Sequence, residues 1–240
     1  MKNVKLVSAE ILNFLRRTDT CTVSNAIESF DVRMRNEGYI HGGVKCLFPE
    51  LKPAVGYAVT GRIRTTAPPV VRNLCYYNKP DWWEHVAKFP NPKILVLADV
   101  DHAPGVGALF GEIHAQIARG LGCVAYVSNG SVRDVPALKH AGFQCFAGGV
   151  SVSHAYAHIV EFGDPVEIGS LKISPGDLLQ GDCHGVQKIP HNIAHELAGA
   201  VARIVAREAE LIRLCQRPDF SIEDLTAILA DADAQPADTQ

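Results

Sequence analysis

Apolar residues form short continuous runs in the middle of the chain, and these runs predict a parallel sheet. The run 94–98 has strand length and no polar interruption, as is typical of a strand covered on both faces. Residues 123–127 and 144–147 predict two more buried strands, and helical patterns at about 111–119 and 135–140 lie between the three runs. This strand–helix–strand–helix–strand alternation favours parallel neighbours.

Antiparallel pairing is predicted toward the C-terminal half of the chain. Residues 166–168 and 171–173 flank Gly169-Ser170, a two-residue turn with glycine where a positive φ is needed. A second turn at 175–177 precedes another strand. Further elements are predicted as strands at 54–64, 178–179 and 186–189, and as a helix after Pro80 through Lys88.

The two ends of the chain are predicted to be helical. The first 30 residues indicate two helices, and Thr22 or Ser24 can cap the second through a side-chain oxygen. A long helix is predicted from about Asn192 to Cys215. The tail carries one short helix capped at Ser221 and then a flexible end. Without an internal repeat or a linker, we expect one domain over 1–216 and an appendage over 217–240.

Composition excludes several classes of protein. Of the 240 residues, 47% are hydrophobic and 20% charged, which is ordinary for a globular protein. The net charge of −3 and the lack of a basic run do not indicate nucleic-acid binding. No apolar stretch approaches the roughly 18 residues that span a membrane, and residues 1–17 resemble an amphipathic helix rather than a signal peptide. Seven scattered cysteines without a CxxC pair indicate buried, reduced thiols in a cytoplasmic protein.

A glycine-rich segment, residues 105–111, precedes one of the predicted helices. Glycines let backbone N–H groups approach a ligand closely, and the start of a helix favours an anion. The spacing is not GxGxxG, and no acidic residue stands suitably after the next strand, so a dinucleotide site is not indicated. A simple tight turn remains the alternative to an anion site.

The pair Arg133-Asp134 follows the second buried strand. Open α/β sheets bind ligands at the carboxyl ends of their strands. A carboxylate there can bind a hard cation, and a neighbouring guanidinium can hold a carboxylate or a developing negative charge. A surface ion pair, with Asp134 capping the next helix, accounts for the same residues, so both interpretations stay open.

Glu208 is notable because it falls on the apolar stripe of the long helix. At 100° per residue it lies almost directly below Leu197. A buried carboxylate is unfavourable unless it is paired or faces another subunit's site. A structural ion pair is therefore the alternative to a functional role. The stripe consists of Leu197, Val201, Ile204, Val205, Leu211, Ile212 and Cys215.

The ten histidines form no HExxH motif and no known zinc spacing. His102, His114, His154 and His184 lie near the candidate segments. Taken alone, each fits a structural role better than a catalytic one.

Three ordered blocks together resemble the family of the regulator of ribonuclease activity A, which includes the class II pyruvate aldolases for 4-hydroxy-4-methyl-2-oxoglutarate. The resemblance runs from Thr22 to about Glu208. It implies an α/β fold of the β/β/α swivelling type, with a central parallel segment, antiparallel hairpins and flanking helices, assembled as a homotrimer or homohexamer. The blocks are Gly111-Glu112 with Ala118, Gly120 and Gly122; Asn129-Gly130 with Val132-Arg133-Asp134; and residues 174–177 with Asp182, residues 184–186 and Pro190.

The resemblance to the aldolases implies roles for three charged residues. Asp134 would ligate Mg²⁺ or Mn²⁺, with waters and a small 2-oxo acid completing the coordination. Arg133 would stabilise the enolate of pyruvate. Glu112 stands where the aldolases place an acidic residue that holds metal-bound water.

The same resemblance implies how the substrate is held. Gly111 and the backbone N–H groups of Ile113 and His114, at a helix start, would bind the pyruvate carboxylate. Glu208 resembles a C-terminal acidic residue that reaches a neighbouring subunit's site.

Four positions depart from the aldolase pattern. Glu112 replaces an aspartate, Asn129 replaces an aspartate, Gly148 replaces an arginine, and His184 replaces an acidic residue. These departures bear on the substrate more than on the fold.

Three functions are compatible with these residues. The first is a metal-dependent carbon–carbon lyase that cleaves a 4-hydroxy-2-oxo acid or decarboxylates oxaloacetate. The second is a non-catalytic regulator that binds an RNA-processing enzyme through its oligomer surface. The third, a phosphohistidine carrier using His184, lacks a dedicated motif.

Overall fold

The computed structural model describes residues 4–69 and 80–233. Its helices are α1 (Ala9–Leu15), α2 (Thr20–Glu28), α3 (Pro80–Ala87), α4 (Glu112–Gly120), α5 (Val135–His140), α6 (Leu197–Cys215) and α7 (Ile222–Asp233). Its strands are β1 (Lys45–Cys46), β2 (Ala54–Arg64), β3 (Lys93–Asp99), β4 (Ala108–Phe110), β5 (Cys123–Val127), β6 (Ser131–Val132), β7 (Gln144–Ala147), β8 (Gly149–Val150), β9 (His158–Phe162), β10 (Val166–Ile168), β11 (Leu171–Ile173), β12 (Leu178–Asp182) and β13 (Gly185–Ile189).

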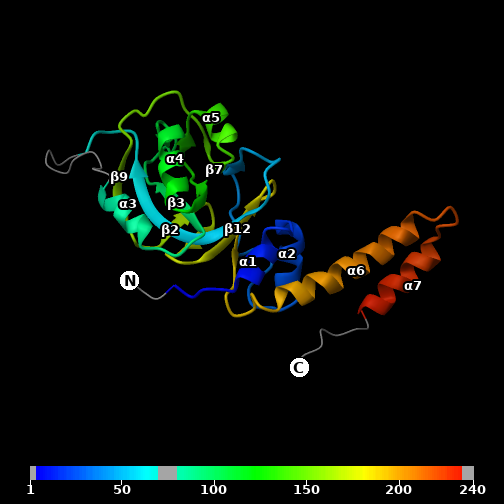
Figure 1. The fold of residues 1–240 in the computed structure, drawn as a ribbon. Helices are drawn as coiled ribbons and strands as arrows, with labels where there is room; N and C mark the ends of the chain where they lie inside the picture. The colour runs from blue at the N-terminus through cyan, green and yellow to red at the C-terminus, as the bar shows by residue number, and fades with distance from the viewer. Residues whose placement is uncertain (1–3, 70–79, 234–240) are drawn as a thin grey trace.

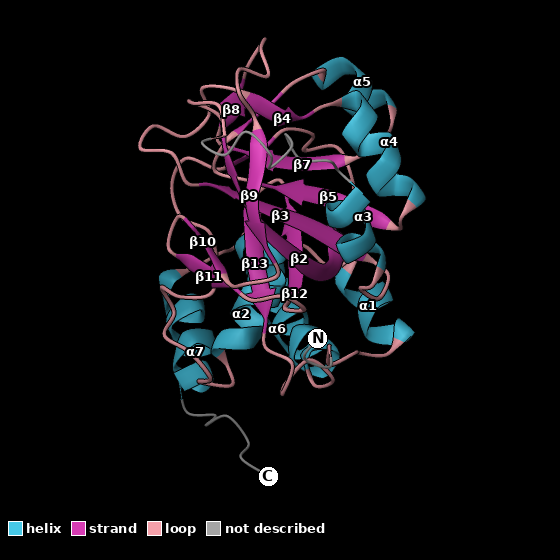
Figure 2. Ribbon diagram, turned by 90° about the vertical axis from the view of Figure 1, so that its left-hand side faces the viewer, coloured by secondary structure: helices cyan, strands magenta, loops and turns pink. Residues whose placement is uncertain are grey.

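A mixed sheet forms the centre of the molecule (Figures 1 and 2). Its strand order is β1-β7-β5-β3-β2-β12-β13, and β9 also pairs with β2. The neighbours β2, β3, β5 and β7 run parallel, which confirms the predicted parallel segment. The strands β12 and β13 form an antiparallel hairpin and β12 runs antiparallel to β2, while β10 and β11 form the predicted hairpin around Gly169-Ser170.

Both faces of β3 are covered, which explains its uninterrupted apolar sequence. Leu95 and Leu97 pack in the core cluster that contains Trp82 of α3 and Leu138 of α5. Ile94 and Val96 face the other way, into a cluster that includes the hairpin β10–β11. Side chains alternate across a strand, so a strand between two layers needs apolar residues at every position.

A third core cluster lies under α1, α2 and the start of α6, where they pack on β2, β12 and β13. Beyond Val201, α6 leaves the body of the protein, and α7 turns back along it to form a projecting two-helix arm (Figure 1). The side chains of Val205 and Ile212 on this arm are 48% and 55% exposed.

Two predictions about helix ends are wrong. The N-cap of α2 is Asp19, whose carboxylate accepts the backbone N–H of Thr22 at 2.9 Å, rather than Thr22 or Ser24. The long helix starts at Leu197 rather than Asn192, because residues 191–196 form turns. The cap predicted for the last helix is confirmed: Ser221 Oγ accepts the N–H of Asp224.

Glu208 is exposed on α6, so its predicted burial on an apolar stripe is wrong for a single protomer. The helical spacing is as expected, but the middle of α6 has left the core by that point. The stripe is covered at Leu197 and Val201, but Val205 and Ile212, which flank Glu208, remain exposed in the described part of the protomer.

The cysteines are more exposed than predicted. Cys123 and Cys145 are buried, but Cys21, Cys183 and Cys215 are exposed, and Cys75 lies outside the described residues. Within the described ranges, no helix has the length and apolar character needed to cross a membrane.

Candidate functional site

A small parallel sheet, β4-β6-β8, brings two distant segments together. The strand β4 ends at Phe110 and β6 ends at Val132, and these two residues are partners in the ladder. The backbone N–H of Arg133 donates to the carbonyl of Phe110 at 3.0 Å. Gly111 and Arg133 therefore leave adjacent parallel strands at the same end, so two of the sequence blocks meet.

Gly111 is needed because the chain approaches the Arg133–Asp134 segment closely. A Cβ at this position would lie 2.5 Å from Asp134 Oδ2 and 2.8 Å from Arg133 Cγ. The φ of −150° is open to any residue, so close approach rather than backbone conformation selects glycine here.

Asp134 adopts a left-handed backbone conformation, with φ 55° and ψ 38°. Although it occupies the N-cap position of α5, its side chain makes no capping hydrogen bond to that helix. Its Oδ2 instead accepts the N–H of Glu112 at 3.2 Å, and its Oδ1 lies 3.3 Å from Arg133 Nε. The ion pair of the expected alternative is present, but its helix cap is not, because the carboxylate contacts the start of α4 instead of capping α5. The backbone of Asp134 is in a sparsely populated conformation.

Several groups hold Asp134 in its ionised form. The N–H of Glu112 has the largest effect and lowers the pKa of Asp134; partial burial raises it, and Arg133 and then His154 lower it further, so the net shift is downward. The Asp134 side chain is 38% exposed, so a ligand can reach it.

The start of α4 is suited to an anion. The first hydrogen bond within the helix runs from Ala115 N to Gly111 O, so the N–H groups of Glu112, Ile113 and His114 precede it. The side chains of Glu112 and Ile113 are exposed, and the ring of His114 lies 5.9 Å from that of Trp83 and 6.1 Å from that of Phe110. The residues predicted to hold a substrate carboxylate are thus brought beside Arg133 and Asp134.

Two further residues support the site. The sequence did not indicate Asp99, and it favoured a structural role for His154. His154 Nδ1 lies 2.9 Å from the carbonyl of Ala108, which fixes the loop after β8 against β4. Asp99 is buried, and its Oδ2 accepts the N–H of Gly105 at 2.8 Å. Burial raises the pKa of Asp99. Of the glycine-rich segment, residues 105–107 form a turn whose Gly105 is held by Asp99, residues 108–110 form β4, and Gly111 is the N-cap of α4.

Other candidate residues lie elsewhere. Glu208 is on the arm, which projects away from α4 and α5 of the same protomer (Figure 1). His102 is exposed, and His184 is on the β12–β13 turn. Gly148 cannot accept the arginine of the aldolase pattern without rearrangement, because a Cβ there would lie 2.1 Å from the carbonyl oxygen of Asn129.

Comparison with known proteins identifies the family. A family model described as RraA-like, Aldolase/RraA, matches residues 20–187. The chain belongs to the RraA-like family. A Halalkalibacterium halodurans protein provisionally named a 4-hydroxy-4-methyl-2-oxoglutarate aldolase is 33% identical over 84 residues. The match covers 35% of this chain and spans only 40% of that relative's length.

Solved structures share the fold. An uncharacterised protein from Pseudomonas syringae pv. tomato superposes with a TM-score of 0.72 at 19% identity, over 92% of this chain and 95% of that one. Streptomyces coelicolor RraAS2, described as an unusual member of the RNase ES inhibitor RraA family, gives 0.65 at 19% identity, over 89% and 99%. These similarities confirm the expected fold. The RraA-like family thus contains proteins named as aldolases and proteins named as ribonuclease inhibitors.

Proposed function

We propose that this RraA-like protein is a divalent-metal-dependent carbon–carbon lyase that acts on a small 2-oxo acid. The observation that carries the proposal is the left-handed conformation of Asp134, whose carboxylate leaves α5 uncapped and lies against the start of α4. A purely structural cap would need no such strain. Residues held in sparsely populated conformations cluster at active sites and ligand clamps.

The side chains here fit Mg²⁺ or Mn²⁺. Such hard cations take oxygen ligands, keep several waters, and are often held by one or two carboxylates. Asp134 offers an ionised, accessible carboxylate, and Glu112 offers a second exposed carboxylate one residue from Gly111. Asp134 would hold the cation and Glu112 would orient its waters. When bound, the cation would polarise the 2-oxo group of the substrate.

The remaining groups account for binding and charge stabilisation. The N–H groups of Ile113 and His114 would hold the substrate carboxylate at the positive end of α4. The guanidinium of Arg133 would stabilise the negative charge that develops on the 2-oxo oxygen.

Both candidate reactions develop this same charge. In retro-aldol cleavage, the proton of the 4-hydroxyl would pass to the Glu112 carboxylate through a water that Glu112 orients, C4 becomes the carbonyl carbon of the departing product, and the C3–C4 bond breaks. The electron pair of that bond is delocalised onto the 2-oxo oxygen, and return of the same proton to C3 then gives pyruvate. In oxaloacetate decarboxylation, carbon dioxide is the leaving group and the same charge forms.

We also propose that the site is completed by Glu208 from a second subunit of a homotrimer or homohexamer. The exposed apolar side chains of Val205 and Ile212 support contact between the arm and another protomer, because such a stripe on a projecting helix is normally covered. Glu208 lies between them in the sequence and would approach the partner's cation.

A panel of 2-oxo acids tests the proposal. Purified protein would be assayed for pyruvate release with oxaloacetate and with 4-hydroxy-2-oxo acids, in Mg²⁺, in Mn²⁺ and after treatment with EDTA. We expect turnover of at least one substrate that is lost with EDTA and restored by added metal. Absence of turnover across the panel would favour the other activity named in the family, binding to an RNA-processing ribonuclease.

A further inference from the structure

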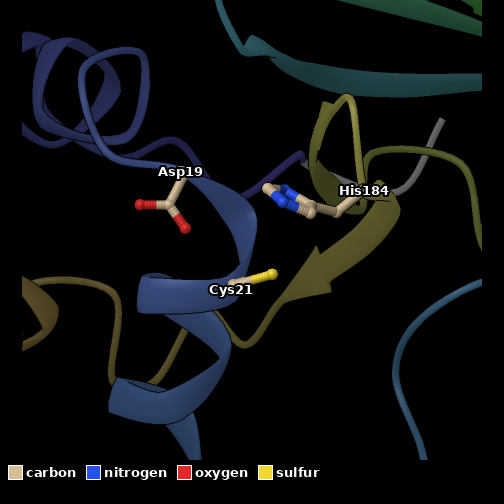
Figure 3. A group of neighbouring side chains, drawn as sticks. All are labelled: Asp19, Cys21 and His184. Atoms are coloured by element: carbon tan, nitrogen blue, oxygen red, sulfur yellow. The ribbon is translucent and has the colours of Figure 1, made fainter. Parts of the chain in front are cut away.

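A second group of potential ligands lies on the first turn of α2 and the β12–β13 turn (Figure 3). Asp19, Cys21 and His184 each present one ligand atom, and these three atoms all lie within 4.8 Å of one another. All three residues are exposed. Asp19 and Cys21 precede His184 by more than 160 residues in the sequence, so the fold brings these side chains together.

Asp182 fixes the two segments that carry these ligands. It is 4% exposed, and its Oδ2 accepts the N–H of Thr20 at 2.8 Å while its Oδ1 accepts the Thr20 hydroxyl at 2.7 Å. Oδ1 also accepts the backbone N–H of His184 at 2.9 Å. Thr20 stands between Asp19 and Cys21, so one buried carboxylate holds both halves of the group in place.

The same carboxylate orients the imidazole of His184. Its Oδ1 lies 3.1 Å from Nδ1 of the ring. A proton on Nδ1 completes this hydrogen bond and leaves the lone pair of Nε2 available to a cation. Histidines that bind metals usually donate their other ring N–H to a carboxylate in this way, which fixes the tautomer and makes the ligand more basic.

Asp182 itself is poorly placed to be a ligand, since it is buried and its two carboxylate oxygens already accept four hydrogen bonds. Asp19 is exposed and, within the described part of the chain, accepts one hydrogen bond at each oxygen, both from Thr22, so lone pairs remain for a cation. Cys183 Sγ lies 3.5 Å from Nδ1 and 3.8 Å from Nε2 of His184, and Cys183 forms a second group of potential ligands with His184 and Asp182. That second group needs the Asp182 carboxylate, which already holds the two segments together. Cys183 is also closer to Nδ1, the ring nitrogen that contacts Asp182, whereas in a cysteine hydrolase the thiol and the orienting carboxylate lie at opposite nitrogens of the ring. These contacts favour metal binding over nucleophilic catalysis.

We propose that Asp19, Cys21 and His184 form a site for one Zn²⁺-like divalent cation, with solvent in the fourth position. One thiolate, one imidazole and one carboxylate are the ligand types that zinc takes in proteins, whereas Mg²⁺ and Ca²⁺ avoid sulfur. Bonds of about 2.0–2.3 Å place tetrahedral ligands about 3.3–3.8 Å apart. Since the three ligand atoms all lie within 4.8 Å of one another, the exposed side chains reach that spacing by approaching by at most about 1–1.5 Å.

The charges around Cys21 suit a cation. The carboxylates of Asp19 and Asp182 act electrostatically on the Cys21 thiol, so negative charge gathers around its sulfur. A divalent cation bound there would be attracted by these carboxylates and would displace the thiol proton. The site is separate from the Asp134 site and does not depend on the proposed lyase activity.

Cobalt titration tests the site. Protein stripped with EDTA would be titrated with Co²⁺, whose bond to a thiolate gives a charge-transfer absorption band, and then with Zn²⁺. We expect one equivalent of Co²⁺ to bind with that band and Zn²⁺ to displace it. Mutating a residue that only hydrogen-bonds to a metal ligand typically lowers metal affinity by about 10–100-fold. Because Cys21→Ser and His184→Ala change the ligands themselves, they should weaken binding at least that much. Cys21→Ser should also abolish the band.

Matched controls separate this site from other thiols and from the other carboxylate. Cys215→Ser removes an exposed cysteine on α6, and Asp134→Ala removes the proposed Mg²⁺ ligand; both should develop the full thiolate band of the wild type, because neither change touches Asp19, Cys21 or His184. A band that does not saturate at one thiolate-bound Co²⁺ per chain, or an unchanged band in Cys21→Ser, would overturn the proposal.

A second measurement uses the unaltered protein and so does not depend on how the variants fold. Zn²⁺ should slow alkylation of Cys21 by iodoacetamide at least tenfold, as followed by mass spectrometry of the peptides. Alkylation of Cys215 should be unchanged. Equal effects of Zn²⁺ on the two cysteines, or no effect on Cys21, would exclude Cys21 as a ligand.

Discussion

Replacing Gly111 by alanine would test whether the close approach of Asp134 to α4 is required for turnover. The new Cβ would lie 2.5 Å from Asp134 Oδ2, and ordinary contact begins at 3.4 Å. The carboxylate must therefore retreat by about 1 Å. Arg133 Cγ, at 2.8 Å from the new Cβ, must also move by a smaller amount. Because both displaced atoms belong to side chains rather than to the backbone and the φ of residue 111 suits alanine, the protein should fold.

The expected loss of activity follows from that displacement. A misplacement of about 1 Å in an active site can cost about 100-fold in rate, so we expect Gly111→Ala to lower kcat/KM by about 100-fold. Gly111→Ala should change the free energy of unfolding by less than about 1 kcal/mol, since removing a glycine at a compatible position stabilises by about 0.4–1 kcal/mol and offsets the local crowding.

Gly120→Ala is the matched control for this experiment. Gly120 ends the same helix, and a Cβ there would have nothing within 4 Å. This variant should gain up to about 1 kcal/mol in stability, because alanine is the better helix former, and should keep its activity. Pyruvate release and urea unfolding would be measured for both variants. Wild-type kcat/KM in Gly111→Ala would refute the role given to the Asp134 carboxylate.

Asp134→Ala should abolish metal-dependent pyruvate release and leave the protein folded because the residue is exposed, with a loss of about 1–2 kcal/mol in stability because alanine is disfavoured at φ 55°; a metal-loaded variant with wild-type turnover would remove it from the site. Arg133→Lys should lower kcat/KM by about 10²-fold or more, because lysine lacks the planar fork that contacts two oxygens, and an active variant would exclude the role in charge stabilisation. Mixing inactive Asp134→Ala with inactive Glu208→Ala under conditions of subunit exchange should restore part of the activity, and no recovery after proven exchange would argue against a shared site. Asp101→Ala should destabilise the protein by about 2 kcal/mol at pH 7, since Asp101 accepts the N–H groups of Thr65 and Thr66. Burial raises the pKa of Asp101, but these hydrogen bonds outweigh it and lower the pKa in the folded protein. The stability that ionised Asp101 contributes is therefore fully present above about pH 3.9 and is lost as the pH falls through the folded-state pKa. If Asp101→Ala destabilised the protein equally at pH 2 and at pH 7, this explanation would be contradicted.

The parallel core could be predicted from the sequence because burial on both faces leaves a direct trace in composition. The runs that became β3, β5 and β7 contain almost no polar residues, and apolar runs of this length between predicted helices are typical of strands buried between two layers. The hairpin β10–β11 could also be predicted from the sequence, because its turn requires a positive φ and glycine stands at that position, Gly169.

The conformation of the site could be predicted only in part. Sequence spacing placed Arg133-Asp134 after a buried strand, but nothing in it indicated that Asp134 would adopt φ 55° and turn its carboxylate toward α4. That contact depends on the pairing of Phe110 with Val132, which brings together segments about 20 residues apart. Long-range pairing of two very short strands leaves no periodic pattern.

Glu208 shows a different limit. Helical periodicity correctly assigns a residue to a face of a helix, but it does not show which layer covers that face. The chain of one protomer leaves this part of α6 exposed. Whether another subunit covers it depends on assembly, which periodicity does not encode.

The β4-β6-β8 ladder also has a kinetic consequence. Backbone hydrogen bonds join the segments that carry Gly111 and Arg133, so this part of the candidate site is already formed in the absence of a ligand. Little conformational entropy is then lost on binding, which benefits affinity directly. We therefore expect a 2-oxo acid to associate in a single fast phase in stopped-flow experiments, without the slower step that accompanies the ordering of a loop.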